Sequence, residues 1–162
     1  MLPEVRLSPI GVVHTTATNE EIRERRKGIA SEVEVFGPYA EGLEGIDRFS
    51  HIFVMCYLDR LRPEQKGPLR VRPRGLLRLG FSLEELPLVG VFALDSPSRP
   101  NPVSLSLVPL VGRKGRRLVV SGLDIFDETP VLDIKPYQRS YRAASYRVPE
   151  WHRRILRRAG YV

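Results

Sequence analysis

The run HIFVMCYL, residues 51–58, decides the fold, because its apolar side chains fall at both odd and even positions. A strand that is apolar on both faces is covered on both faces, so we expect this run to form a central strand. Residues 32–36 alternate apolar with polar side chains and predict a strand with one buried and one open face. Further strand-like runs occupy residues 10–14, 88–94, 104–111, 118–125 and 131–134.

Helix signals are few and lie outside these runs. Thr18-Asn19-Glu20-Glu21 has the spacing of a capping box and predicts a short helix that runs to Lys27. Strands without long helices between them favour a mainly β protein, an antiparallel or mixed β-barrel with a few peripheral helices. No Gly-x-Gly-x-x-Gly follows a strand, so a Rossmann-type cofactor site is not supported.

The C-terminal end predicts a basic amphipathic helix. Glu150 suits its first turn and Gly160 suits its stop, while Trp151 and Ile155 fall on one face. We expect this helix to dock on the protein through those two apolar residues. The chain is therefore divided into a barrel domain, residues 1–137, and a basic C-terminal extension, residues 138–162.

Composition excludes several classes of protein. The 162 residues contain no apolar run close to the ~20 that a membrane span needs. The N-terminus lacks the basic-then-apolar order of a signal peptide, so we expect a cytoplasmic protein. A lone Cys56 and three scattered His do not predict a metal site or a disulfide.

The net charge of +7 is concentrated at one end. Residues 138–162 hold seven Arg and one Glu, so this stretch carries +6 and the rest of the chain carries +1. A basic end on a nearly neutral body is typical of a protein that binds a polyanion such as nucleic acid. The alternative is a solubilising surface, or a face that packs on acidic groups of a partner.

Three segments carry candidate functional residues. The first, GVFALDSPSRPNP at residues 90–102, holds three prolines that stiffen the chain. Such a loop suits Asp95, Arg99 and Asn101 if a ligand must find them already in place; a structural turn is the alternative.

The second segment, residues 119–137, places Asp133 and Lys135 on one face of a strand. Asp133 lies between apolar neighbours and is a candidate partly buried carboxylate, although an ion pair with Lys135 is an equally good explanation. The third segment, residues 36–51, ends in Phe49-Ser50-His51, where His51 is more often structural than catalytic.

Together and in this order, these segments resemble the TsaA-like family, which includes the YaeB and TrmO proteins. The matching motifs are Pro9-Ile10-Gly11, Phe49-Ser50-His51 and the stretches 90–102 and 127–137. The resemblance implies a homodimeric, S-adenosylmethionine-dependent methyltransferase with a β-barrel core. Characterised bacterial members methylate N6 of threonylcarbamoyladenosine next to the anticodon of certain tRNAs.

The resemblance also implies site residues. By position, those that bind S-adenosylmethionine would be Gly28, Ile29, Asp59, Arg60, Asp95, Leu105, Gly122, Leu123 and Asp124. For methyl transfer, Asp133 is the candidate base or orienting group, because a carbamoylated N6–H needs only a modest base. Lys135 and Tyr137 would position the acceptor, and Arg99 and Asn101 would hold the methionine end or a phosphate. No metal is implied.

Two departures from the family pattern bear on function. Asp95 stands where the family usually has Arg, so a positive charge becomes negative, and Glu128 replaces a Gly of the Asp-Gly-Thr-Pro motif. Longer bacterial members have a further C-terminal domain, and here we expect the arginine-rich end to contact tRNA instead. The alternatives are a methyltransferase of the same fold with another acceptor, or a non-catalytic module that binds the cofactor or RNA.

Overall fold

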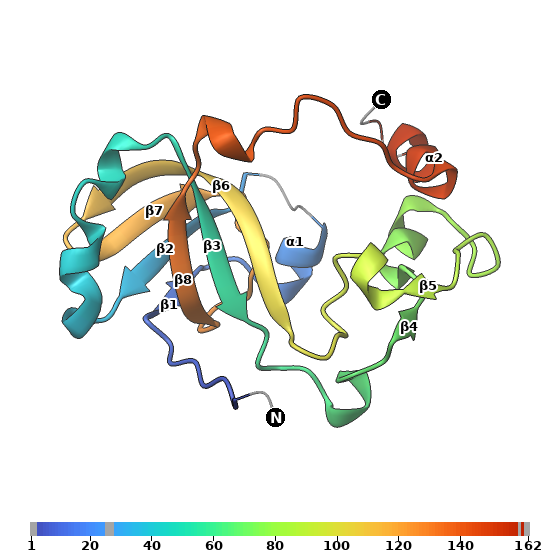
Figure 1. The fold of residues 1–162 in the computed structure, drawn as a ribbon, viewed down its shortest axis with the longest axis horizontal. Coiled ribbons are helices and arrows are strands. Elements are labelled where there is room, and N and C mark those ends of the chain that lie inside the picture. The colour runs from blue at the N-terminus through green and yellow to red at the C-terminus, as the bar shows by residue number, and fades with distance from the viewer. Residues whose placement is uncertain (1–2, 25–27, 159, 161–162) are drawn as a thin grey trace. The chain divides into compact units, whose positions relative to one another are not determined.

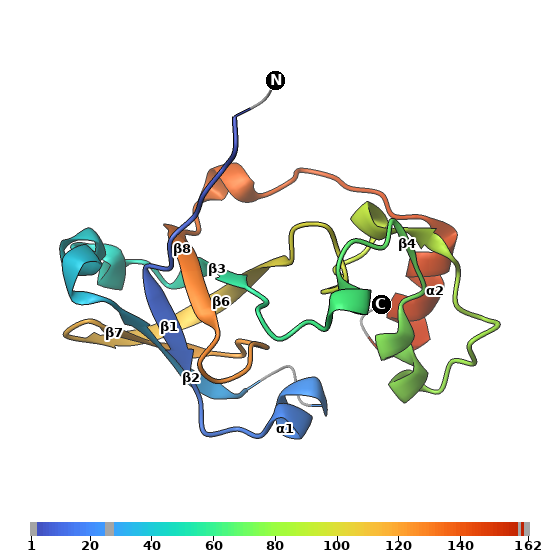
Figure 2. The same cartoon turned by 90° about the horizontal axis from the view of Figure 1, so that it is seen from below.

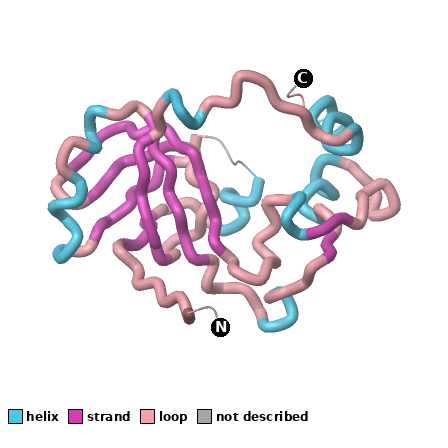
Figure 3. Tube along the Cα trace, viewed as in Figure 1, coloured by secondary structure: helices cyan, strands magenta, loops and turns pink. Residues whose placement is uncertain are grey.

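The computed structural model describes residues 3–24, 28–158 and 160, which fall into two compact units. The first unit comprises residues 1–60 and 102–138, and the second comprises residues 61–101 and 139–162. The first holds the long strands and the second holds mostly short helical turns and loops (Figures 1 and 3). Each unit is described separately.

The first unit is a closed antiparallel barrel of six strands in the order β1-β2-β7-β6-β3-β8. Figure 2 shows β1 lying between β2 and β8. The predicted mainly β barrel with few helices is therefore confirmed. The strands are β1 (Gly11–His14), β2 (Ala30–Val35), β3 (His51–Tyr57), β6 (Val103–Lys114), β7 (Arg117–Ser121) and β8 (Pro130–Pro136).

Side chains alternate in direction along the strands, and those that point inward form the core of the barrel. In β3, Ile52, Val54 and Cys56 point inward and are fully buried, whereas Phe53 and Met55 on the outer face are only half-buried. The central position of β3 is confirmed by its pairing with both β6 and β8, but its outer face is only partly covered within the barrel unit. Inward residues of the other strands complete one continuous core with these side chains.

The strand register defines two ends of the barrel. Three strand ends and three strand starts come together through the pairing of His14 with Glu32, Val12 with Pro130, Ala30 with Ser121, and Tyr57 with Val103. We call this end the loop end; it holds residues 15–24, 28–29, 58–60 and 122–129. The opposite end holds two 3₁₀ helices, η1 (Gly37–Leu43) and η2 (Ile46–Arg48).

The capping box predicted at Thr18 is present. The Thr18 hydroxyl accepts from the Glu21 N–H at 3.2 Å, and the Glu21 carboxylate accepts from the Thr18 N–H at 2.8 Å. These reciprocal bonds satisfy two otherwise unpaired donors at the start of α1 (Asn19–Glu24). The predicted continuation to Lys27 lies outside the described residues. No helix in the described ranges is long and apolar enough to cross a membrane.

The second unit has its own small core. Phe81, Leu86 and Ile155 are buried together, with Leu76 and Trp151 packed against them. Trp151 and Ile155 come from α2 (Glu150–Arg158), so the predicted docking of the C-terminal helix through these two residues is confirmed. The other elements are η3 (Pro63–Gln65), β4 (Arg70–Val71), η4 (Arg74–Leu79), β5 (Val89–Gly90), η5 (Val91–Ala93) and η6 (Arg139–Tyr141).

One expectation for this region differs from the structure. The strand expected over residues 88–94 is limited to β5, because β4 offers only two residues for pairing and the chain then turns into η5. Residues 61–101 fall in the same compact unit as α2. As a statement about domains, the boundary at residues 137/138 stays a prediction.

Candidate functional site

Four of the candidate cofactor residues meet at the loop end. The Gly122 N–H donates to the Ile29 carbonyl at 2.8 Å, which joins the chain before β2 to the chain after β7. Gly28 and Gly122 both have positive φ, 82° and 76°, a conformation that favours glycine. Leu123, the next residue, is fully buried in the barrel core and anchors this loop. Residues 28, 29, 122 and 123 therefore lie together at the loop end.

Asp124 extends this group toward β6. Its carboxylate accepts a hydrogen bond from the Ser106 hydroxyl at 3.2 Å. Leu105, the neighbouring candidate on β6, pairs with Met55 of β3 and is 64% exposed on the outer face. Ser106 and Leu105 are successive residues of β6, so the Asp124 contact and the Leu105 side chain lie on opposite faces of this strand.

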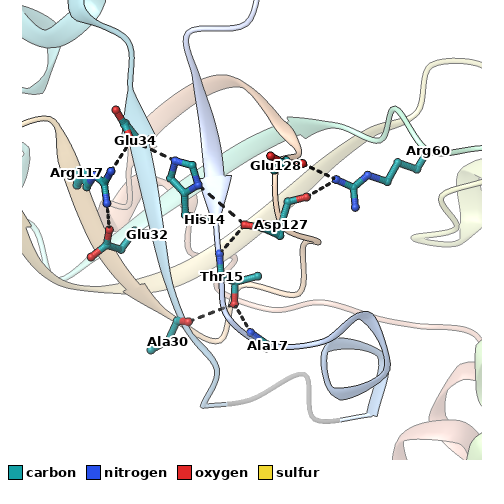
Figure 4. Close-up of polar contacts among 10 residues, drawn as sticks. All are labelled: His14, Thr15, Ala17, Ala30, Glu32, Glu34, Arg60, Arg117, Asp127 and Glu128. Carbon is teal, nitrogen blue, oxygen red and sulfur yellow. Dashed lines mark hydrogen bonds and ion pairs between the residues drawn. The ribbon is translucent and has the colours of Figure 1, made fainter.

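Arg60 connects the end of β3 to the turn before β8. Its guanidinium Nη2 donates to the Asp127 carbonyl at 2.6 Å and lies 4.0 Å from the Glu128 carboxylate (Figure 4). Asp127 Oδ1 also accepts from the Thr15 N–H at 2.9 Å, so the turn contacts two other segments of the loop end. Asp59, beside Arg60, is exposed. The structure therefore brings Asp59 and Arg60 to the same end as the Gly28–Gly122 loops.

The turn before β8 contains one of the departures from the family motif. Glu128 is the sole described non-glycine residue with positive φ, at 60°. This left-handed conformation costs a non-glycine residue ~1–2 kcal/mol. Glu128 thus adopts a strained conformation that a Gly, the usual residue of the family motif here, would adopt easily.

Sequence reasoning missed a charged network on the outer face of β1, β2 and β7. His14 Nε2 lies 3.1 Å from Glu34 Oε2, and His14 Nδ1 lies 4.0 Å from Asp127 Oδ1 (Figure 4). Arg117 pairs with Glu32 at 3.0 Å and with Glu34 at 2.9 Å. The hydrogen bond from Arg117 to Glu32, with added attraction from Glu34, raises the pKa of Arg117. The alternation in 32–36 placed both Glu on the outer face, but only cross-strand register identifies their partners.

Asp133 and Lys135 form the ion pair that the sequence left open as an alternative. Asp133 Oδ2 lies 2.7 Å from Lys135 Nζ, and Oδ1 accepts from the Ile134 N–H at 2.9 Å. The Asp133 side chain is 42% exposed. It also borders a cleft of about 510 Å³ whose other lining residues include Tyr39 and Glu41 of η1. A cleft of this size is in the range of small-ligand sites.

Tyr137 lies at the opposite end of the barrel from the cofactor candidates. Its N–H donates to the His51 carbonyl at 3.0 Å, and its ring meets the Phe53 ring edge-on, with centroids 5.8 Å apart. His51 Nδ1 lies 3.0 Å from the Ser50 hydroxyl. Within one barrel, the structure therefore does not bring Tyr137 together with the loop end.

The remaining candidates, Asp95, Arg99 and Asn101, belong to the second unit. The Arg99 guanidinium donates to the Leu94 and Ser96 carbonyls, at 3.3 and 3.4 Å, and so closes its own loop. Asp95 and Asn101 are exposed. The loop has the structural-turn character that the sequence left open for it, and it presents Asp95 and Asn101 outward.

Neither Cys56 nor a cluster of metal ligands among the described residues contributes to a catalytic site. Cys56 is buried in the barrel, and this burial raises the pKa of its thiol to about 12, so it is not a nucleophile at neutral pH. Among the described residues, no three His, Cys, Asp or Glu side chains cluster as metal ligands would.

Comparison with known proteins identifies a matching protein family and several relatives. The family model described as the tRNA-methyltransferase O N-terminal domain matches residues 16–142. A "Probable S-adenosyl-L-methionine-binding protein" of Methanothermobacter thermautotrophicus is 39% identical over 137 residues, which are 83% of this chain and 90% of that protein. An "S-adenosyl-L-methionine-binding protein" of Archaeoglobus fulgidus is 40% identical over 134 residues, 81% of this chain and 88% of that protein.

Solved structures agree with this match. A crystal structure of TrmO aligns with a TM-score of 0.66 at 30% identity, covering 91% of this chain and 62% of that one. TrmO from Pseudomonas aeruginosa aligns with a TM-score of 0.67 at 28% identity, again covering 91% and 62%. The chain thus spans less than two thirds of the length of these crystallised proteins.

Proposed function

The chain belongs to the tRNA-methyltransferase O N-terminal domain family, and from this we propose that it binds S-adenosylmethionine at the loop end and methylates tRNA. The observation that carries the proposal is the meeting of the Gly28–Ile29 and Gly122–Asp124 segments with Arg60 at one end of the barrel. The names of the archaeal relatives support the cofactor. Activity on tRNA would place the protein in the cytoplasm.

The chemistry of the loop end fits this cofactor. A Cβ at Gly28 would meet no atom of the described residues within 4 Å, so none of them crowds this stretch of backbone. Asp59 and Asp124 can accept from ribose hydroxyls or from the ammonium group of the methionine end. Arg60 has donors left beyond the one used on Asp127, so it can pair with the methionine carboxylate.

We propose Arg60 as the partner of the cofactor carboxylate because Asp95 cannot fill that role. An Asp cannot pair with the cofactor carboxylate, whereas the family usually has an Arg at that position. We assign to Leu105 an apolar contact with the cofactor, and to Leu123 the burial that holds the Gly122 loop in place. When bound, the cofactor supplies a methyl group already activated by the sulfonium, so the protein mainly aligns donor and acceptor and excludes water.

For the acceptor, we propose N6 of threonylcarbamoyladenosine next to the anticodon. Asp133 at the cleft would take the N6 proton, with Lys135 holding the carboxylate in place through their 2.7 Å contact. Tyr137 would contact the acceptor nucleotide. Arg99 keeps its loop closed, and Asn101 is left to contact the methionine end or a phosphate.

Because these acceptor residues lie away from the loop end of their own barrel, we propose that the enzyme is a homodimer. In such a dimer, the cleft of one protomer would face the loop end of the other, so that each active site combines both sets of residues. The half-buried outer face of β3 supports a contact of this kind.

Charge supports tRNA as the partner. The second unit contains fourteen Arg and Lys against five Asp and Glu, whereas the barrel unit contains twelve against fourteen. The positive excess of the whole chain therefore belongs to the second unit, including residues 61–101, and not to the C-terminal end alone. This is the distribution expected of a chain that joins a polyanion-binding unit to a cofactor-binding barrel.

Titration calorimetry with S-adenosylmethionine and S-adenosylhomocysteine tests the cofactor, and mass analysis of tRNA nucleosides after incubation tests the reaction. Micromolar binding and a gain of one methyl on threonylcarbamoyladenosine are expected. No binding at millimolar cofactor, with or without tRNA, would contradict the proposal.

Asp95 favours a second candidate, a module that binds the cofactor or RNA without catalysis. Binding without methyl transfer by the natural chain, together with strong gains in affinity and turnover for Asp95→Arg, would support this second candidate. Turnover by the natural chain that Asp95→Arg leaves unchanged would exclude it.

A further inference from the structure

A repeated triplet links the barrel to α2. Residues 139–147 read RSYRAASYR, so Ser-Tyr-Arg occurs at 140–142 and again at 145–147. We call residues 139–147 the Ser-Tyr-Arg strap. After the short η6 turn it has no regular structure up to α2, and each of its residues is exposed. In Figure 1 it is the orange segment that leads from η6 to α2.

The strap exposes aromatic rings that the fold does not bury. Tyr146 is 82% exposed and Tyr141 is 49% exposed. In each triplet the tyrosine is followed directly by an arginine, Arg142 or Arg147. An exposed ring beside a cation presents a stacking surface together with a positive charge.

The arginines of the strap differ from those of α2 in what they contact. Arg154 donates to the Glu85 carbonyl at 3.0 Å, and Arg158 donates to the Gly80 carbonyl and lies over the Phe81 ring. These side chains hold α2 on the second unit. By contrast, the side chains of Arg142 and Arg147 have no hydrogen bond or ion pair with any residue that the structure describes.

These features favour single-stranded nucleic acid over a duplex. In a duplex the base faces are stacked and hidden, so exposed tyrosines gain little from it. In a loop the bases are unstacked and bind to aromatic side chains, while arginines contact the phosphates. Tyr146 follows Tyr141 by five residues, so an extended strap would hold their Cα atoms up to ~18 Å apart, enough to span several nucleotides.

We propose that the Ser-Tyr-Arg strap binds single-stranded RNA, with tyrosine rings stacked on unpaired bases and Arg142 and Arg147 on the phosphates. This inference rests on the proposed function, in which the substrate is a tRNA whose target lies in the anticodon loop. The strap would then select the loop, while the loop end of the barrel holds the cofactor.

Fluorescence anisotropy with the full chain tests the stacking. The two probes are a labelled RNA stem-loop and an RNA duplex of equal nucleotide number without a loop. Tyr146→Ala should weaken stem-loop binding by ~5-fold to 100-fold, since one stacked base contributes ~1–3 kcal/mol. Duplex binding should stay within twofold of wild type. Tyr146→Phe, which keeps the ring, should bind like wild type.

The arginines are tested by salt dependence. Arg142→Gln with Arg147→Gln should lower the slope of log K against log salt on the stem-loop by ~0.7 for each phosphate that is no longer neutralised. The matched control is Arg153→Gln with Arg157→Gln, which removes the same charge from arginines that pair with Glu150. This control should change the slope much less.

These experiments distinguish a failure of the strap proposal from a failure of the proposed methyltransferase function. Stem-loop binding that is unchanged in Tyr146→Ala, or weakened equally on stem-loop and duplex, would overturn the role of the strap. S-adenosylmethionine titration of the same variants should match wild type, because the strap is not part of the loop end. If wild type binds no cofactor but Tyr146 still governs stem-loop binding, the proposed methyltransferase fails and the strap assignment stands.

Discussion

Arg60 donates from Nη2 to the main-chain carbonyl of Asp127 at 2.6 Å, which ties the residue after β3 to the turn before β8. A bond to a main-chain carbonyl does not depend on the side chain at position 127, so it sets the shape of the turn itself. The same turn is held from a second side by the Thr15 N–H. Arg60 and the Thr15 N–H therefore both hold this turn at the loop end.

Replacement of Arg60 should weaken cofactor binding more than folding. Arg60→Ala removes both the bond to Asp127 and the proposed partner of the cofactor carboxylate, and charge-assisted hydrogen bonds contribute ~1.5–3 kcal/mol. We expect S-adenosylmethionine affinity to fall by at least ~10-fold in calorimetry. Arg48→Ala, at the opposite end of the barrel, is the control. Equal affinity in both variants would remove Arg60 from the site.

The strain at Glu128 can be released. Its φ of 60° is easy for Gly and unfavourable for other residues, so Glu128→Gly should raise the free energy of unfolding by ~1 kcal/mol in urea titration. Glu128→Ala is the matched control, because it also removes the exposed carboxylate but keeps a Cβ. A gain of the same size in both variants would show that the charge, and not the backbone, is responsible.

The core of the second unit depends on α2. Ile155→Ala removes a buried side chain that packs with Phe81 and Leu86, and such changes cost ~2–5 kcal/mol. The fluorescence of Trp151 should shift to longer wavelength at lower urea than in wild type. Arg153→Ala, on the exposed face of α2, should leave the transition in place. Because α2 covers this core, truncation of the chain after Tyr137 would expose Phe81 and Leu86. A truncated chain is therefore not a suitable variant for testing which residues contact RNA.

Cys56 should resist alkylation in the folded protein. Burial raises its pKa from 9.0 to about 12, so at pH 8 its thiolate fraction is ~1000-fold below that of an ordinary thiol. Iodoacetamide should label the chain's one Cys rapidly in urea and very slowly without it. Labelling at equal rates in both conditions would contradict the burial of Cys56.

The sign of the pH effect on stability follows from the same shift. The unfolded thiol ionises near pH 9 and the folded thiol does not until about pH 12. Its contribution to stability is therefore complete below pH 9 and is lost progressively between these values. Cys56→Ala should lose less stability than wild type between pH 9 and 10.5 in urea titration. Equal losses would contradict the raised pKa.

Some features could be predicted from the sequence because they depend on neighbouring residues. The Thr18–Glu21 capping box, the alternation of buried residues in β2 and the apolar face of α2 all follow local periods of three, two and four residues. The replacement of Gly by Glu128 was also visible in the sequence. Its positive φ was not, because a backbone angle is set by the turn in which it lies.

Other features required distant segments to meet. His14, Glu34 and Arg117 come from three strands, and no local pattern states which charges face each other. The packing of α2 on Phe81 and Leu86 joins residues about seventy positions apart. The separation of Tyr137 from the loop end follows from the direction in which β8 runs between β1 and β3.

By itself, the sequence determined that the protein is a β-barrel with a basic amphipathic helix, because strand and helix periods are local properties of the chain. Only the tertiary structure decided which candidate residues share an end of the barrel and which do not. The physical reason is antiparallel register: it brings Ile29, Arg60 and Gly122 to one end while it carries Tyr137 to the other.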